Sequence, residues 1–162
     1  MAPSRSDYYF FLDGGLIALE KGWAINLSGG YHHASAKKGG GFCIYADITL
    51  CIRHLQKSVP SRVKKAMIID LDAHQGNGHE TDFLGDENIS IIDVYNHNIY
   101  PGDYAAAKAI KRDVELSFRD DDEAFLKKLR ENIPVEIESF KPDFILYNAG
   151  TDCLVGDPLG GK

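Results

Sequence analysis

Short apolar runs alternate with amphipathic stretches along this chain, and that alternation predicts buried strands separated by helices. Five segments have the length and apolar content of strands: 23–27, 66–72, 89–94, 114–118 and 143–147. The run at 66–72 opens with four consecutive apolar residues, which is typical of a strand buried on both faces of a parallel sheet.

The stretches between these strands carry helical signals. Apolar residues over 42–57 recur at spacings of three and four, which places five of them on one face: Ile44, Ile48, Cys51, Ile52 and Leu55. Acidic residues at 120–123 favour the start of a helix that Pro134 should kink or divide. Residues 16–21 are expected to form the end of a helix that Gly22 stops, and 79–84 a short helix, whereas 13–15 reads as a turn. Strands alternating with helices indicate an α/β fold with a parallel sheet.

The composition adds limits on where the protein acts and on what it binds. The chain has 162 residues, 44% hydrophobic and 26% charged, which fits one soluble globular domain. It shows no signal peptide and no apolar run long enough to span a membrane, so we expect an intracellular protein. A net charge of -6 disfavours nucleic-acid binding and suits a basic peptide substrate. The three cysteines form no CxxC pair, which favours reduced thiols.

The strand at 66–72 leads into residues of the types that bind metals. Asp70, Asp72 and His74 alternate by two, so in an extended chain their side chains point to the same side. The glycines at 76 and 78 then allow a tight turn. An alternative is that the aspartates only cap this turn and that the histidine is incidental.

Three loops follow predicted strands, at 31–33, 72–74 and 150–152. They should meet at one edge of the parallel sheet, because the carboxyl ends of its strands lie there. Together they would bring Asp72, His74 and Asp152 to one place. Two carboxylates and one imidazole, with a position left for water, make the ligand set of a catalytic zinc ion. His32 and His33 would supply the proton transfer that hydrolysis needs, although each could also be an ordinary loop residue.

The motifs Asp-Leu-Asp-Ala-His-Gln-Gly-Asn-Gly at 70–78 and Tyr-Asn-Ala-Gly-Thr-Asp at 147–152 resemble the zinc-dependent histone deacetylases. The residue sequences of these motifs are most similar to those of the class IV branch of that family. The resemblance covers 15–162 as a partial catalytic domain and leaves 1–14 unmatched. It implies an α/β fold with a three-layer open parallel sheet flanked by helices, of the arginase and deacetylase type, here incomplete at both ends.

The resemblance also implies roles for the residues of this site. Asp72, His74 and Asp152 match the zinc ligands, and His33 matches the general base and acid. His32 matches the second histidine of the tandem.

Two further residues match groups that orient this tandem. Asp70 matches the carboxylate that orients His32. Asn77 stands where many relatives carry an aspartate that orients the other histidine, and an asparagine stabilises an imidazolium less strongly.

A structural potassium ion is implied as well, held by oxygen ligands. The resemblance gives Asp70 and Asp93 to this site, although Asp93 could instead be a turn residue. Phe83, Asp86 and Ile89 match positions around a second monovalent-cation site.

The resemblance also places an acyl-lysine tunnel beside the predicted metal site. Gly41 and Phe42 match one wall of the tunnel, and Tyr100 matches the opposite wall. Both aromatic residues could equally be core residues. The remaining histidines, His54 and His97 together with His79, match nothing catalytic and are expected at the surface or in the core.

The expected activity is zinc-dependent removal of acyl groups, acetyl or long-chain, from lysine side chains of histones or other proteins, in the nucleus or cytoplasm. The expected partners are acylated lysine peptides such as histone tails; no direct nucleic-acid binding is expected, and the oligomeric state stays open. The family's first strands and its tyrosine-bearing glycine-rich loop have no counterpart here, so we expect the isolated chain to be a poor deacylase. An acetylpolyamine amidohydrolase and a non-catalytic metal- or partner-binding form are the alternatives.

Overall fold

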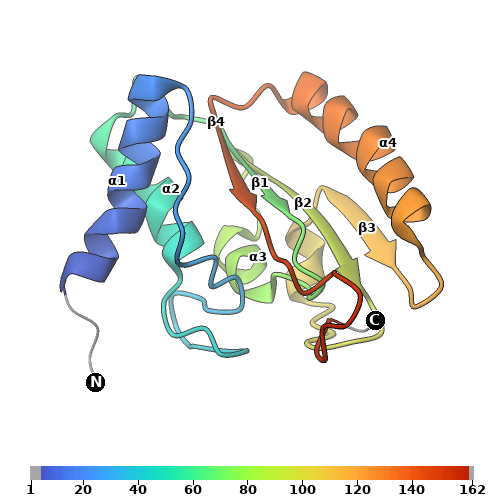
Figure 1. Cartoon of the computed structure of the whole chain (residues 1–162). Coiled ribbons are helices and arrows are strands. Elements are labelled where there is room, and N and C mark those ends of the chain that lie inside the picture. The colour runs from blue at the N-terminus through green and yellow to red at the C-terminus, as the bar shows by residue number, and fades with distance from the viewer. Residues whose placement is uncertain (1–4, 161–162) are drawn as a thin grey trace.

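A four-stranded parallel sheet forms the middle layer of the molecule (Figure 1). The computed structural model describes residues 5–160, with side chains described from residue 12 onward. The strand order is β3-β2-β1-β4. The bounds are β1 Ala66–Asp70, β2 Ile89–Asn96, β3 Arg112–Leu116 and β4 Phe144–Asn148.

Helices cover both faces of this sheet. They are α1 Arg5–Lys21, α2 Asp47–Ser58, α3 Asn77–Phe83, the 3-10 helix η1 Ala106–Ala109 and α4 Asp122–Phe140. In Figure 1, α1 and α2 lie on one side of the sheet and α4 lies on the other, which confirms the predicted three-layer α/β fold. Among residues 5–160, no helix combines the length and apolar character needed to cross a bilayer.

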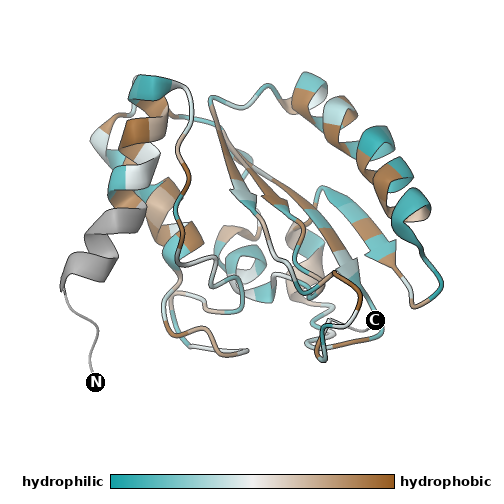
Figure 2. Cartoon of the chain, viewed as in Figure 1, coloured by the Kyte–Doolittle hydropathy of each residue, from teal (hydrophilic) through white to brown (hydrophobic). Residues whose placement is uncertain are grey.

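The two faces of the sheet pack into separate apolar clusters. Ile68 and Ile91 pack against Ile52 and Leu55 of α2, whereas Met67 and its neighbours pack against the apolar side of α4. All residues of β1 and β2 are buried, as expected for central strands of a parallel sheet covered on both sides. Figure 2 shows hydrophobic colour along these strands and mixed colour along α4, which faces solvent on one side.

The register of the sheet positions the site. Asp70, the last residue of β1, pairs with Asp93 of β2 and with Asn148 of β4. The carboxyl ends of β1 and β4 therefore finish side by side, and the loops that follow them meet at one edge of the sheet.

Four of the five predicted strands are confirmed, with shifts of one or two residues at their ends. The strand predicted at 23–27 is wrong: the segment has no regular structure, and Leu27 is 96% exposed. Apolar content alone does not make a strand without a partner. The segment instead forms one wall of a groove, and β4 lies opposite it.

The turn predicted at 13–15 is also wrong, because α1 continues through it. A Cβ built on Gly15 would lie 3.0 Å from Cys51 Sγ and 3.0 Å from Leu55 Cδ1. The glycine therefore serves the close packing of α1 on α2, and not a change in chain direction. The predicted end of this helix before Gly22 is confirmed.

Helix α2 begins at Asp47, later than predicted, because residues 42–46 are irregular, with Cys43 bridged to Gly40. Ile44 consequently does not join the buried face and is 75% exposed, whereas Ile48, Cys51, Ile52 and Leu55 do join it. Helix α4 is not divided at Pro134, which lies within a continuous helix.

Candidate metal centre

Two carboxylates and an imidazole face one another where β1 and β4 end. Asp72 and His74 follow β1 directly, and Asp152 follows β4. His74 Nδ1 lies 2.7 Å from Asp152 Oδ2 and 3.2 Å from Asp72 Oδ1. One ligand atom from each residue falls within 4.8 Å of the others, and all three side chains are partly exposed. The structure thus brings the predicted zinc ligands together at a point that solvent reaches.

Backbone hydrogen bonds fix this group. The His74 amide donates to Asp72 Oδ1 at 2.9 Å, and the Ala73 amide donates to Asp152 Oδ1 at 2.8 Å. The loop after β4 approaches closely because residue 150 is glycine: a Cβ there would lie 2.4 Å from Asp72 Cα. The segment between β1 and α3 is therefore hydrogen-bonded to the loop after β4 and packed against it.

The donor set fits a divalent metal ion. In the described part of the chain, the ion pairs of Asp72 and Asp152 involve only histidines, so no lysine or arginine neutralises the two carboxylates. Hydrogen bonds to Asp152 and then to Asp72 raise the pKa of His74 to about 9. Two carboxylates that stabilise the protonated form of an imidazole would also attract a metal cation. One nitrogen and two oxygens form a ligand set that zinc accepts.

His32 lies behind this group and contacts a carboxylate through each ring nitrogen. Its Nδ1 is 3.0 Å from Asp70 Oδ2, and its Nε2 is 3.5 Å from Asp72 Oδ1. Burial lowers the pKa of His32, but the charge of Asp70 and its hydrogen bond outweigh burial and raise the pKa overall.

His33 has a different environment, although its ring lies only 4.0 Å from that of His32. Its Nδ1 is 2.9 Å from Asn77 Oδ1, the acceptor of a neutral amide. Burial, followed by the charge of His32, lowers the pKa of His33 to about 4. The Asn77 amide nitrogen faces Asp103 Oδ2 at 3.4 Å, so its oxygen is the atom turned toward His33. His33 therefore carries its proton on Nδ1 and a lone pair on Nε2 at neutral pH.

The loop that carries both histidines is held from two sides. Asp47, at the start of α2, accepts hydrogen bonds from the amides of Gly30 and Tyr31 at 2.8 and 2.9 Å. The Gly78 amide donates to the His32 carbonyl at 2.9 Å. The sequence reasoning missed Asp47. Its position in the first turn of a helix was the available signal, but that position did not reveal a distant loop as its partner.

Asp70 is fully buried and accepts four hydrogen bonds. Asp72 N and Asn148 Nδ2 donate to its Oδ1 at 3.1 and 2.9 Å. His32 Nδ1 and His79 Nε2 both approach its Oδ2, at 3.0 and 2.9 Å. The carboxylate predicted to orient His32 thus does contact it. The roles of Asn148 and His79 were missed, because the Asn148 contact joins β4 to β1 and the His79 contact depends on how α3 packs against the end of β1.

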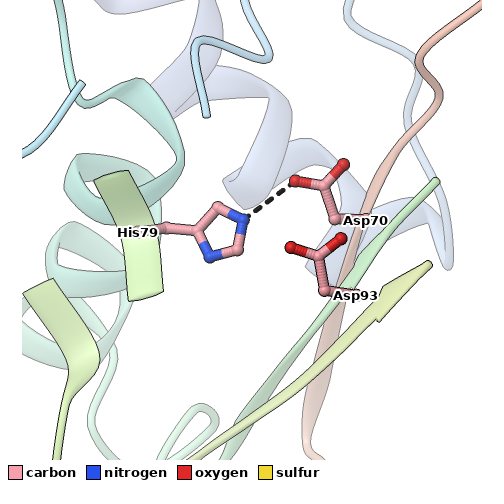
Figure 3. A group of neighbouring side chains, drawn as sticks. All are labelled: Asp70, His79 and Asp93. Atoms are coloured by element: carbon pink, nitrogen blue, oxygen red, sulfur yellow. Dashed lines mark hydrogen bonds and ion pairs between the residues drawn. The ribbon is translucent and has the colours of Figure 1, made fainter. Parts of the chain in front are cut away.

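A second group of metal-ligand types surrounds this carboxylate: Asp70, His79 and Asp93 (Figure 3). All three are buried, in contrast to the Asp72 group. The Gly76 amide donates to Asp93 Oδ2 at 2.8 Å, and Asp93 Oδ1 has no hydrogen-bond partner among the described residues. Burial and the charge of Asp70 raise the pKa of Asp93 well above its usual value. An unpartnered, buried carboxyl oxygen is compatible with a cation nearby.

Phe83 does not join this second group. Its side chain packs in the apolar cluster formed with α2, and its carbonyl accepts a hydrogen bond from the Asp86 amide at 2.9 Å. Asp86 itself pairs with Arg53 at the surface. The cation role that the sequence assigned to Phe83 stays a prediction.

The predicted tunnel residues lie around His33. Tyr100 packs edge-on against the His33 ring, with ring centroids 4.9 Å apart. A Cβ on Gly41 would lie 2.1 Å from His33 Cδ2, so only glycine fits beside this ring. Phe42 has a positive φ of 63° and is 92% exposed, which places it at the surface next to Gly41. The structure therefore brings Gly41 and Tyr100 to the histidine pair, with Phe42 at its outer margin.

Known proteins share the sequence pattern of this chain. The family model described as "Histone deacetylase domain" matches residues 15–162. The chain belongs to the histone deacetylase domain family. Histone deacetylase 2 of Arabidopsis thaliana is 51% identical over 144 residues, which are 89% of this chain and 37% of that protein. The acetoin utilization protein AcuC of Staphylococcus aureus (strain MRSA252) is 33% identical, over 85% of this chain and 38% of that protein.

Solved structures show the same fold. The HD domain of HDA15 superposes with a TM-score of 0.75 at 24% identity, over 93% of this chain and 46% of that one. An acetylpolyamine aminohydrolase from Burkholderia pseudomallei superposes with a TM-score of 0.76 at 19% identity, over 96% and 49%. The chain spans less than half the length of each of these relatives.

Proposed function

We propose that this chain carries the metal centre and proton-transfer histidines of a zinc-dependent hydrolase that removes acyl groups from lysine side chains. The observation that carries the proposal is the group formed by Asp72, His74 and Asp152, with His33 beside it. The His33 and His74 ring centroids are 5.9 Å apart, which is close enough for one substrate group to contact both sites. Membership of the histone deacetylase family supports the reaction class.

Zinc held by Asp72, His74 and Asp152 would supply Lewis-acid polarisation of an amide carbonyl and of a water molecule. The residues of the chain supply the proton transfers. His33, neutral near pH 7 because its pKa is about 4, offers its Nε2 lone pair as general base. The imidazolium that forms when His33 takes a proton from the attacking water gives this proton to the lysine amine as the amide bond breaks. Asn77 holds the His33 Nδ1 proton and so keeps the tautomer that this role needs.

His32 has the complementary role of a fixed electrostatic partner. The pair with Asp70 favours its charged form, and that charge in turn opposes protonation of His33. Two adjacent imidazoles with opposite pKa shifts give one histidine that can accept a proton and one that holds its proton.

For the substrate, we propose acylated lysines of proteins such as histone tails. The two motifs at 70–78 and 147–152 have the wording of the class IV branch, and this supports a class IV deacylase with acetyl or long-chain acyl substrates. The net charge of -6 suits basic peptides and disfavours direct contact with nucleic acid. Nucleus and cytoplasm are the compartments where such substrates occur.

We also propose a structural potassium ion near Asp70 and Asp93. The support is the resemblance to the family together with the unpartnered Asp93 Oδ1. Backbone carbonyls around the end of β1 would complete an oxygen cage, which hard cations prefer.

Hydrolysis can be tested in a chimera in which residues 15–162 replace the aligned stretch of the Arabidopsis protein. Acetyl-lysine peptide, myristoyl-lysine peptide and acetylpolyamine are offered in parallel. We expect turnover of the peptides, and a loss of about 10²–10⁴-fold in His33→Ala with zinc content unchanged. The matched control is His97→Ala, an exposed histidine that contacts the Leu116 carbonyl.

The outcomes separate the candidates. Preference for acetylpolyamine would replace the lysine substrate and leave the reaction class intact. Zinc bound without hydrolysis of any of the three would favour a non-catalytic form and refute the proposal.

A further inference from the structure

His79 is a buried histidine that the proposed reaction does not use, yet it touches the residue that orients His32. It lies on α3, has no exposed surface, and places Nε2 2.9 Å from Asp70 Oδ2 (Figure 3). His32 Nδ1 lies 3.0 Å from the same oxygen. One carboxylate oxygen therefore serves two imidazoles that come from different segments of the chain.

We propose that His79 is a positioning residue: through Asp70 it holds the carboxylate on His32 and so fixes the orientation of the histidine pair. This inference rests on the proposed function only for the catalytic role given to the pair. The hydrogen-bonded chain from His79 to Asp70 to His32 is a property of the fold itself.

The polar balance of His79 supports a donor role at Nε2. Its Nδ1 is buried and has no hydrogen-bond partner among the described residues. A buried polar atom without a partner destabilises the folded state. A phenylalanine would fill a similar space without that cost. The imidazole contributes the Nε2 hydrogen bond to Asp70, which a phenylalanine cannot make.

The backbone around His79 is shaped for this bond. A Cβ on Gly76 would lie 2.1 Å from His79 Nε2 and 2.7 Å from Asp70 Oδ2. Any larger residue at position 76 would therefore push the two groups apart. The glycine just before α3 leaves room for the contact between the imidazole and the carboxylate.

Helix α3 consequently supports both catalytic histidines at once. Asn77, its first residue, contacts His33 directly. His79, two residues later, contacts His32 through Asp70. A shift of this short helix would disturb both imidazoles together, so its placement couples their orientations.

The first test is nuclear magnetic resonance of the 162-residue chain labelled with ¹⁵N in histidine, at constant potassium and zinc. In the wild type we expect two strongly downfield imidazole protons, from His32 Nδ1 and His79 Nε2, with a cross-peak between them. Absence of a hydrogen-bonded His79 Nε2 proton would overturn the proposal without any variant.

The second test compares His79→Phe, which keeps the ring, with His79→Gln, which keeps a side-chain donor. In His79→Phe we expect the His32 Nδ1 proton to lose its downfield position and to exchange with water at least about tenfold faster. In His79→Gln we expect the signal to be retained. A His32 signal that is the same in all three proteins would assign His79 to packing alone and overturn the proposal.

Activity and metal content separate this inference from the proposed function. In the chimera we expect His79→Phe to lower kcat about 10- to 100-fold, the size typical of groups that orient metal-site residues, with KM unchanged and rescue by His79→Gln. Zinc content should equal that of the wild type. If the wild-type chimera binds no zinc and hydrolyses nothing, the proposed function fails, while the resonance test of His79 still stands. A fall in kcat shared equally by the two variants would contradict the positioning role.

Discussion

Two groups of metal-ligand residues lie at the carboxyl edge of one sheet, and they differ in burial and in hydrogen bonding. The outer group, Asp72 with His74 and Asp152, is partly exposed, and its side chains contact mainly one another. The inner group, Asp70 with His79 and Asp93, is completely buried, and its central carboxylate accepts four hydrogen bonds. Residue type alone does not distinguish the two.

Asp70 and Asp72, two aspartates at the end of the same strand, differ in what their side chains can bind. Asp72 keeps a carboxylate that faces other ligands and solvent, so it can bind an exchangeable ion. Asp70, two residues earlier, accepts four hydrogen bonds, and in our proposal it acts on the reaction through the histidine it holds. Burial and the number of hydrogen-bond partners distinguish a candidate ligand of an exchangeable metal ion from a candidate positioning group.

The largest expected effect separates the two groups by stability. Asp70→Ala removes the common acceptor of two buried imidazoles, a side-chain amide and a backbone amide, and we expect it to lower the free energy of unfolding by about 3–5 kcal/mol. Asp152→Ala, in the absence of metal, should cost no more than about 1 kcal/mol, because its side chain is partly exposed. Urea denaturation of both variants checks this. Equal losses of unfolding free energy in the two variants would contradict the difference between the inner and the outer group.

The next effect concerns stabilisation by metal. A ligand that binds only the folded chain at 100 times its Kd adds about 2.7 kcal/mol to the free energy of unfolding. We expect zinc to add this amount to the wild type and to His97→Ala, and to add nothing to Asp72→Ala. Thermal unfolding with and without zinc measures it. Equal stabilisation of Asp72→Ala would place the binding site elsewhere.

A smaller change exchanges the partner of one histidine. Asn77→Asp would give His33 a carboxylate in place of an amide, and a carboxylate favours the imidazolium. We expect the pKa of His33 to rise from about 4 by about one unit or more, equivalent to about 1.4 kcal/mol. Titration of the ring protons by magnetic resonance follows it. An unchanged pKa would mean that His32, and not residue 77, controls His33.

The smallest expected effect comes from an ion pair outside both groups, which sets a baseline. Arg53 lies 2.6 Å from Asp86, and its side chain is 45% exposed. Burial alone would raise the pKa of Asp86, but the hydrogen bond from Arg53 outweighs it and lowers the pKa. Since an acid with a lowered folded pKa stabilises the fold above its unfolded pKa of about 3.9, the pair contributes at neutral pH.

The corresponding variant is Asp86→Asn, which should lose about 0.2–1 kcal/mol at pH 7. The difference from the wild type should shrink as pH falls from about 4 through the lowered pKa of Asp86. Urea denaturation at both pH values measures it. A difference that persists at low pH would show that packing, and not charge, is responsible.

Much of this arrangement was predictable from local sequence. The strands predicted at 66–72 and 143–147 placed Asp72, His74 and Asp152 at one sheet edge, because parallel strands end together. The roles of His79 and Asp47 were not predictable, since each contact depends on how a helix packs against another segment and not on the order of strand ends in the sheet. The strand predicted at 23–27 is wrong because its residues suit a strand but no neighbouring strand pairs with it in the described fold.

The central claim is that the outer group, and not the inner one, holds zinc. The most direct measurement is zinc content per chain, by mass spectrometry after equilibration and removal of free metal. It compares the wild type with His74→Ala, with His79→Gln and with the exposed control His97→Ala. We predict one zinc per chain in the wild type, in His79→Gln and in His97→Ala, and almost none in His74→Ala. Zinc that persists in His74→Ala but disappears from His79→Gln would contradict the account.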